Sequence, residues 1–141
     1  MALWLMKQEP DDYNFADLER DGTTTWDGVI NPLALKHLRA CAAGDLAFYY
    51  HTGKEKAVVG VMEVVRVVPD AADAKRVTVT VRAARRLAKP VTLATVKADA
   101  AFAKWELVTQ SRLSVMPVTQ AMWDRVEKYA AGTMKVKKPK A

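Results

Sequence analysis

Hydrophobic and polar residues alternate along several short stretches of the chain, and this two-residue period predicts β-strands. A brief apolar run predicts a central, covered strand over Ala2 to Lys7. Residues 46–51 alternate and residues 57–68 are rich in β-branched side chains, which together predict an antiparallel hairpin. Gly60 lies within the second of these strands and predicts a β-bulge or a close approach to its backbone. The clearest alternation, at residues 76–87, predicts a further strand.

Helices are predicted where a capping side chain precedes apolar residues that recur every three or four positions. Four segments have this pattern, and their expected caps are Asn14 or Asp12, Asn31, Thr92 and Thr119. Pro32 supports the second helix, because its fixed φ suits the first helical turn. A surface loop that presents Trp26 is predicted at residues 21–28, and a short strand is predicted at residues 112–118.

These elements predict an α/β (α+β) fold, in which about five mostly antiparallel strands curl into a small mixed barrel with helices at its ends and in the crossovers. Half of the 141 residues are hydrophobic, which fits one domain with one core, and we expect it to cover residues 1–131. No apolar run reaches the roughly 18 residues that a bilayer span needs, so we expect no membrane partner.

Residues that form disulfides or hold metals are few. Cys41 is the only cysteine, so it cannot form an internal disulfide. Neither it nor the two histidines has a spacing typical of metal ligands, and we expect no metal and no cofactor. These features fit a reducing compartment, and we expect a cytoplasmic monomer.

The net charge of +6 is concentrated at the carboxyl end of the chain. Lys135, Lys137, Lys138 and Lys140 supply four of these charges, and subtracting them leaves +2 for the rest. Residues 132–141 combine lysine, glycine and proline with little to bury, which predicts a disordered tail. Such a tail adds salt-sensitive affinity for polyanions, or it only aids solubility.

Polar and aromatic residues gather in four motifs at the ends of the predicted elements. The motifs are MKQEP (6–10), WDGVINP (26–32), FYYHTG (48–53) and QSRLSVMPV (110–118). They supply flat rings, amides, hydroxyls and cations, which suit an unpaired nucleic-acid base, because stacking on an aromatic ring is worth about 1 to 3 kcal/mol. Tyr49 and Tyr50 point to opposite faces of a strand, and we favour Tyr50 as the one that lines a pocket.

A basic group lies where the strand at residues 76–87 ends. It consists of Arg82, Arg85, Arg86 and Lys89. These cations would grip phosphates next to a base pocket, although they also fit the solvated end of a strand.

Simpler interpretations of single residues stay open. Trp26 also fits a packing residue of the core. His51 fits a general base, and Cys41 fits a nucleophile, although Cys41 has no acidic or amide partner at a recognisable spacing. One alternative is therefore a nucleic-acid or nucleoside modifying enzyme that uses His51, and another is a protein-interaction module.

The four motifs closely resemble those of the EVE domain, in the same order and at the same spacing. In the notation of that family they are W-L-M-K-x-E-P, W-D-G-V-x-N, Y-H-[ST]-G and S-R-L-S-V-x-P-V. The resemblance runs from Leu3 to Tyr129 and implies a PUA-like barrel, similar in fold to ASCH, YTH and SRA domains, that holds a base, often a modified one, at its rim. By this resemblance the base pocket corresponds to Lys7, Trp26, Asn31, Tyr50, His51, Ser111 and Arg112.

The chain departs from the common EVE pattern around this pocket. Many relatives have serine where Gln8 stands, arginine at Ile30, an aromatic residue at Pro32 and serine at Thr52. We therefore expect its preferred ligand to differ from that of relatives with the fuller pattern.

The leading hypothesis is a non-enzymatic nucleic-acid-binding module that reads a modified base. Trp26 or Tyr50 would stack on an extruded base, and Asn31 with Ser111 would read its edge. Lys7, Arg112 and the lysine-rich tail would hold phosphate. The expected partner is DNA or RNA, and the sequence does not distinguish the two.

Overall fold

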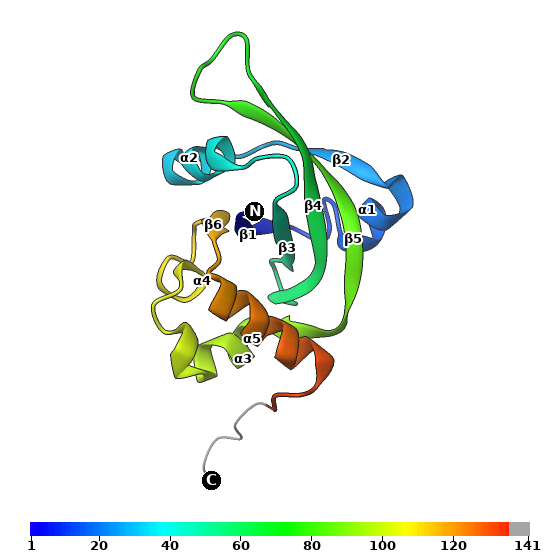
Figure 1. The fold of residues 1–141 in the computed structure, drawn as a ribbon, viewed down its shortest axis with the longest axis vertical. Coiled ribbons are helices and arrows are strands. Elements are labelled where there is room, and N and C mark those ends of the chain that lie inside the picture. Colours follow the sequence, from blue (N-terminus) through cyan, green and yellow to red (C-terminus); the bar gives the residue numbers. More distant parts are fainter. Residues whose placement is uncertain (136–141) are drawn as a thin grey trace.

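The computed structural model describes residues 1–135, and residues 136–141 of the predicted tail lie outside the described residues. A curved sheet of six strands forms the body of the molecule (Figure 1). The strands are β1 (Leu3–Gln8), β2 (Thr23–Trp26), β3 (Leu46–His51), β4 (Ala57–Pro69), β5 (Val77–Thr92) and β6 (Val115–Pro117). Their order is β2-β5-β4-β3-β1-β6, so β2 and β6 are the two edges and the sheet is barrel-like without closing.

The sheet is mixed. β1 pairs with β3 in parallel, and all the other pairings are antiparallel. A parallel pair needs a long crossover, and the chain between β1 and β3 accordingly contains α1 (Phe15–Asp21), β2 and α2 (Pro32–Ala40). The prediction of a mixed, mostly antiparallel α+β barrel-like fold is confirmed, with one strand more than expected.

The predicted helix caps are confirmed. The helices are α1 (Phe15–Asp21), α2 (Pro32–Ala40), α3 (Leu93–Ala98), the 3-10 turn η1 (Ala100–Phe102), α4 (Glu106–Thr109) and α5 (Gln120–Ala131). Asn14, Asn31, Thr92 and Thr119 each accept a hydrogen bond from a backbone N–H of the first turn that follows. Within residues 1–135, no helix has the length and apolar character needed to cross a bilayer.

The core lies on both faces of the sheet, because successive residues of β3 point in opposite directions. Phe48 stacks on Trp123 of α5, with 3.7 Å between ring centroids. Tyr49 packs edge to face against Phe15 of α1, with 5.4 Å between centroids. α5 therefore covers one face of β3 and α1 covers the other, while α2 lies towards the opposite end of the molecule from α5 (Figure 1).

Gly60 lies at an irregularity of β4, as its position in the sequence predicted. The pairing register of β4 shifts between Val58 and Gly60, which marks a β-bulge or a similar irregularity. A Cβ at residue 60 would lie 2.4 Å from Cζ of Phe15. The absence of a side chain is therefore what lets α1 sit against the sheet.

The segment that contains Trp26 is a strand rather than the predicted surface loop. Residues 23–26 form β2 and pair antiparallel with Val79 to Arg82 of β5. The polar threonines resembled a loop, but threonine is β-branched and suits an edge strand. Because β2 adds to the sheet, the Trp26 side chain is turned into the core and only 3% of its surface is exposed.

The predicted boundary of the last strand shifts. The strand expected at residues 112–118 is confined to β6, because a turn closed by Leu113 N–H and Gln110 O (3.0 Å) precedes it. After α5 the chain folds back on the helix end, where the Met134 N–H donates to Lys128 O at 3.2 Å.

Candidate functional site

Two of the sequence motifs meet where the parallel strands β1 and β3 end. The Thr52 N–H donates to Gln8 O at 3.0 Å, and the Thr52 hydroxyl donates to Glu9 Oε2 at 3.0 Å. Gly53 has a φ of 76° and lies so close to Glu9 that a Cβ there would be 3.0 Å from Oε1. Glu9 and Thr52 therefore join the two strand ends to each other, a structural role that the sequence did not reveal.

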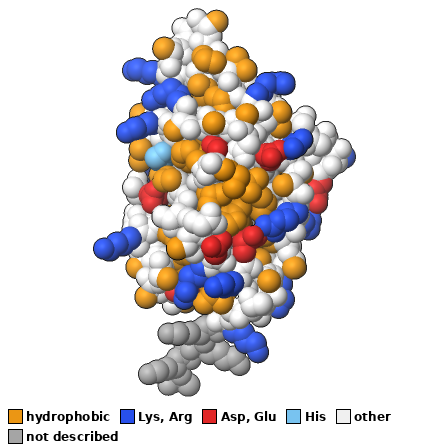
Figure 2. Space-filling model, viewed as in Figure 1, with side chains coloured by type: hydrophobic (Ala, Val, Ile, Leu, Met, Phe, Trp, Pro, Cys, Tyr) orange, Lys and Arg blue, Asp and Glu red, His pale blue; other side chains and the backbone are white. Residues whose placement is uncertain are grey.

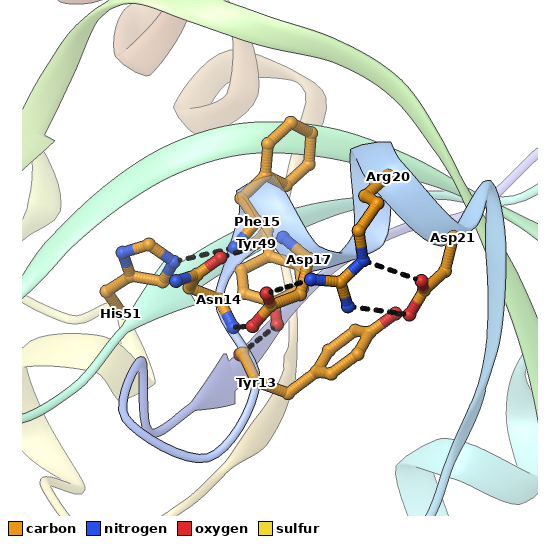
Figure 3. A network of polar contacts seen from close by, with 8 residues as sticks. All are labelled: Tyr13, Asn14, Phe15, Asp17, Arg20, Asp21, Tyr49 and His51. Carbon is orange, nitrogen blue, oxygen red and sulfur yellow. Dashed lines mark hydrogen bonds and ion pairs between the residues drawn. The ribbon is translucent and has the colours of Figure 1, made fainter.

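His51 uses both of its ring nitrogens within the protein. Its Nε2 accepts a hydrogen bond from the Phe15 N–H at 3.0 Å, at the start of α1 (Figure 3). Its Nδ1 lies 2.6 Å from Glu55 Oε1. Since Nε2 is the acceptor, we assign the ring proton to Nδ1, which donates it to Glu55. His51 thus holds α1 against the end of β3 and has no free lone pair in this arrangement.

Trp26 belongs to an aromatic cluster centred on Tyr49. The two rings meet edge to face with 5.4 Å between centroids, and Tyr49 contacts Phe15 and His51 in the same way. The Tyr49 hydroxyl donates to Tyr13 O at 2.5 Å (Figure 3). No ring face of Trp26 is open to a base in this structure, so the predicted stacking platform is not in place.

Three of the predicted residues line one open depression of about 360 Å³ between the start of α2 and the segment that follows α4. Its lining consists of Asn31, Leu33, Thr109, Gln110, Ser111, Arg112 and Leu113. These residues are polar, basic or apolar, and none is acidic. Asn31 and Ser111 are 80 positions apart in the chain, so only the fold brings them together.

Lys7, near the end of β1, contacts one of the residues that line this depression. Its ammonium group donates to Ser111 O at 3.0 Å and lies 5.6 Å from the centroid of the Tyr50 ring. Burial lowers the pKa of Lys7 and raises the pKa of Tyr50 to about 12. Tyr50 is only 3% exposed, so its ring contacts Lys7 from inside the protein and does not line the depression itself.

Asn31 and Arg112 both have hydrogen-bond donors that other groups of residues 1–135 do not use. Asn31 Oδ1 accepts hydrogen bonds from the Leu33 and Ala34 N–H groups at 2.9 and 3.0 Å, which caps α2. The two N–H bonds of its amide remain as donors, because the cap uses only the oxygen. Arg112 is exposed and forms no ion pair with any residue in the described part of the chain.

The four predicted phosphate-binding residues are not one group in the structure. Arg82 pairs with Glu63 of the neighbouring strand, Arg85 with Glu127 of α5, and Arg86 with Glu19 of α1. α1 and α5 cover opposite faces of the sheet, so the three arginines diverge. Figure 2 shows Lys and Arg side chains interspersed with Asp and Glu side chains on the face it presents, rather than gathered in one patch.

Arg86 and Lys89 each have a separate environment. The Arg86 guanidinium lies 5.4 Å from the centroid of the Phe15 ring, where it covers the α1 contact. Lys89 lies near the end of α5, with Nζ 3.5 Å from the position that a Cβ of Gly132 would take. A run of basic residues in a strand therefore did not predict a common site, because bulges and alternation sent the side chains to different partners.

Comparison with known proteins places these features in a family. The family model of the EVE domain matches residues 2–129. The protein Rpa0253 of Rhodopseudomonas palustris is 40% identical, with 96% of both chains covered and a TM-score of 0.87. Human THYN1, solved in complex with DNA that contains 5-methylcytosine, is 28% identical, with 99% of this chain and 100% of that chain covered and a TM-score of 0.84.

Among curated proteins, human thymocyte nuclear protein 1 is 39% identical over 75 residues. The match covers 45% of this chain and 33% of the human protein, so the chain spans about one third of the length of this relative. The family model covers nearly the whole chain, and the motifs that suggested the family lie where the strands β1 and β3 end and around the depression. The chain belongs to the EVE domain family.

Proposed function

We propose that this protein is a non-enzymatic nucleic-acid-binding module that takes one base, in a modified form, at the depression between α2 and residues 109–113. Membership of the EVE family supports this proposal, as does the human relative whose structure contains 5-methylcytosine DNA. The fold similarity to this relative extends over 99% of this chain.

One observation carries the proposal: Asn31 and Arg112, from two distant segments, line one open depression that contains no carboxylate, and Lys7, from a third segment, donates to Ser111 of that lining. Lys7 and Arg112 provide positive charge, and the Asn31 amide provides two N–H donors. Phosphate oxygens and the carbonyl and ring-nitrogen acceptors of a base are the partners that such groups bind. A purely apolar ligand would leave both the charges and the amide without a partner.

Each group has a role that follows from its place. Arg112 is free to turn towards a phosphate or a base edge, while Lys7 is held in position by Ser111 O and Tyr50. Leu33 and Leu113 provide an apolar wall against which a methyl group would fit. Fit of one small group in an apolar recess discriminates by about 1 to 3 kcal/mol.

His51 and Trp26 support the site from inside the protein in this proposal. A general base needs a free lone pair, and both nitrogens of His51 have partners. Neither residue has to touch the ligand for the depression to bind it. We therefore expect binding without chemical turnover of the nucleic acid.

Fluorescence anisotropy with matched oligonucleotides tests the proposal. We expect tighter binding to a duplex with one 5-methylcytosine than to the same duplex with cytosine. Replacing Arg112 by alanine should weaken binding about tenfold, because one phosphate or base contact is lost. Lys7→Met, which keeps the apolar stem of the side chain, should weaken it to a similar extent.

Arg82→Ala is the matched control, since it removes the same charge from a position where the arginine is paired with Glu63. We expect a change of less than twofold. Equal losses for the Arg82 and Arg112 variants, or no loss for Arg112→Ala, would count against a site at this depression. The same series with RNA decides which nucleic acid is preferred.

A further inference from the structure

Ile30 is an exposed aliphatic residue that lies next in the chain to a residue of the proposed site. Its side chain is 76% exposed, and Leu33, which lines the depression, is 36% exposed. Single apolar residues on a surface are common, so exposure alone says little. Ile30, however, directly precedes Asn31, a residue of the depression, and so places an aliphatic side chain next to a cationic, carboxylate-free site.

The backbone that carries Ile30 is fixed on both sides. Before it, Trp26 is buried in the core and Gly28 adopts a φ of 75°, a turn conformation that suits glycine. After it, Asn31 caps α2 through two hydrogen bonds and Pro32 begins the helix. A side chain on such a short, anchored segment is presented to a partner with little loss of backbone freedom on binding.

The chemistry of this site fits nucleic acid better than a protein partner. Arg112 lines the depression together with Leu33, Lys7 contacts Ser111 of the same lining, and no acidic residue lines the depression. Two neighbouring aliphatic residues are too few for a stable protein interface, which needs a much larger buried area. They are enough for one base step, because both faces of a base pair are apolar and only its edges are polar.

We propose that Ile30 is a wedge that enters the base stack of duplex DNA beside the base taken up at the depression. The inference rests on the proposed function. Taking a base out of a duplex leaves a gap and exposes the faces of its neighbours, and an aliphatic side chain that fills this gap offsets part of the unstacking. Isoleucine has no donor or acceptor in its side chain, so it favours extrusion without reading the sequence.

Comparing duplex and single-stranded probes distinguishes insertion of Ile30 into the base stack from a simple surface contact with the nucleic acid. A single strand has no stack to open, so the wedge should matter only for the duplex. Using one sequence with a single 5-methylcytosine in both forms, we expect Ile30→Ala to weaken duplex binding about tenfold and single-strand binding by less than twofold. Ile30→Leu, which keeps the apolar volume, should retain most of the duplex affinity.

Val68→Ala is the matched control, because Val68 is also exposed, at 47%, but lies in β4, outside the depression. It should leave both affinities unchanged. Both isoleucine variants are expected to fold, since the side chain is mostly in solvent, and thermal melting checks this. A second readout places 2-aminopurine next to the 5-methylcytosine: its fluorescence should rise when the wild-type protein binds, and should rise less with saturating Ile30→Ala.

The outcomes distinguish the wedge from the function on which it rests. If the wild-type protein binds neither probe, the proposed function and the wedge both fail. If it binds both and Ile30→Ala weakens them equally, or weakens neither, the function stands and the wedge fails. If Ile30→Ala instead changes the molar mass in light scattering while duplex binding is unchanged, Ile30 is a protein contact and the wedge also fails.

Discussion

Asp99 illustrates how a single carboxylate links two parts of the fold. Its side chain is 8% exposed and accepts hydrogen bonds from Arg125 Nε at 2.6 Å and from the Tyr129 hydroxyl at 2.6 Å. Burial alone favours the neutral form, but these bonds and one from the Ala101 N–H lower the pKa of Asp99 to about 2. The carboxylate thereby ties the chain between α3 and η1 to α5.

The lowered pKa predicts acid sensitivity. The unfolded chain binds this proton with an ordinary pKa of about 4, so the folded state is favoured above that pH and the advantage is lost as the pH falls towards 2. We expect Asp99 to contribute about 2 kcal/mol at neutral pH. Urea unfolding between pH 2 and 6 should show a smaller fall in stability for Asp99→Asn, whereas Asn at the exposed Asp11 should behave as the wild type.

His51 provides a second test at the scale of one residue. Removing its ring leaves the Phe15 N–H buried without an acceptor, which costs about 1 to 3 kcal/mol. His51→Ala should therefore lower the free energy of unfolding by that amount, while His51→Gln, whose amide oxygen lies near the place of Nε2, should lower it less. Equal stability of the wild type and both variants would contradict the assigned role.

At the scale of elements, the contact between Gly60 and Phe15 sets how closely α1 approaches the sheet. A methyl group at residue 60 would overlap the ring, so Gly60→Ala should destabilise the protein by about 1 to 3 kcal/mol. Phe15→Leu alone should also destabilise, because it shortens a buried side chain. The two changes together should cost less than their sum, and a double-mutant cycle from urea unfolding measures this coupling.

Secondary structure was predicted well where short-range hydrogen bonds decide it. The caps at Asn14 and Thr92 lie within three residues of the N–H groups they bind, so both partners of each hydrogen bond belong to one short segment of the sequence. The buried side of α5 depends on more than its own sequence: the helix buries Trp123, Val126 and Ala130 most deeply. The reason is that Trp123 stacks on Phe48, a residue 75 positions away.

At the scale of the whole molecule, the candidate site is assembled from segments that only the topology brings together. β1 lies between β3 and β6, which places Lys7 near both Tyr50 and Ser111. The resemblance to EVE motifs identified these residues, but not their separate roles. Tyr50 lies below Lys7, whereas Asn31 and Arg112 line the surface.

Long-range electrostatics can be tested at the same scale through the tail. Residues 136–141 contain Lys137, Lys138 and Lys140. If they contact phosphates, deleting this segment should reduce the slope of log K against log salt by up to about 2.7, and it should do so equally for duplexes with cytosine and with 5-methylcytosine. An unchanged slope would leave the tail a role in solubility only. A changed preference between the two duplexes would indicate that the tail contacts the modified base.

The sequence by itself determined the strands other than β2, the helix caps, the need for glycine at residue 60 and the family motifs, because these depend on side-chain alternation and on hydrogen bonds between near neighbours. The tertiary structure decided the burial of Trp26, the partners of His51 and the separation of Arg82, Arg85 and Arg86. Those outcomes depend on which strands pair and in which register, and that is settled by packing between residues that are far apart in the chain.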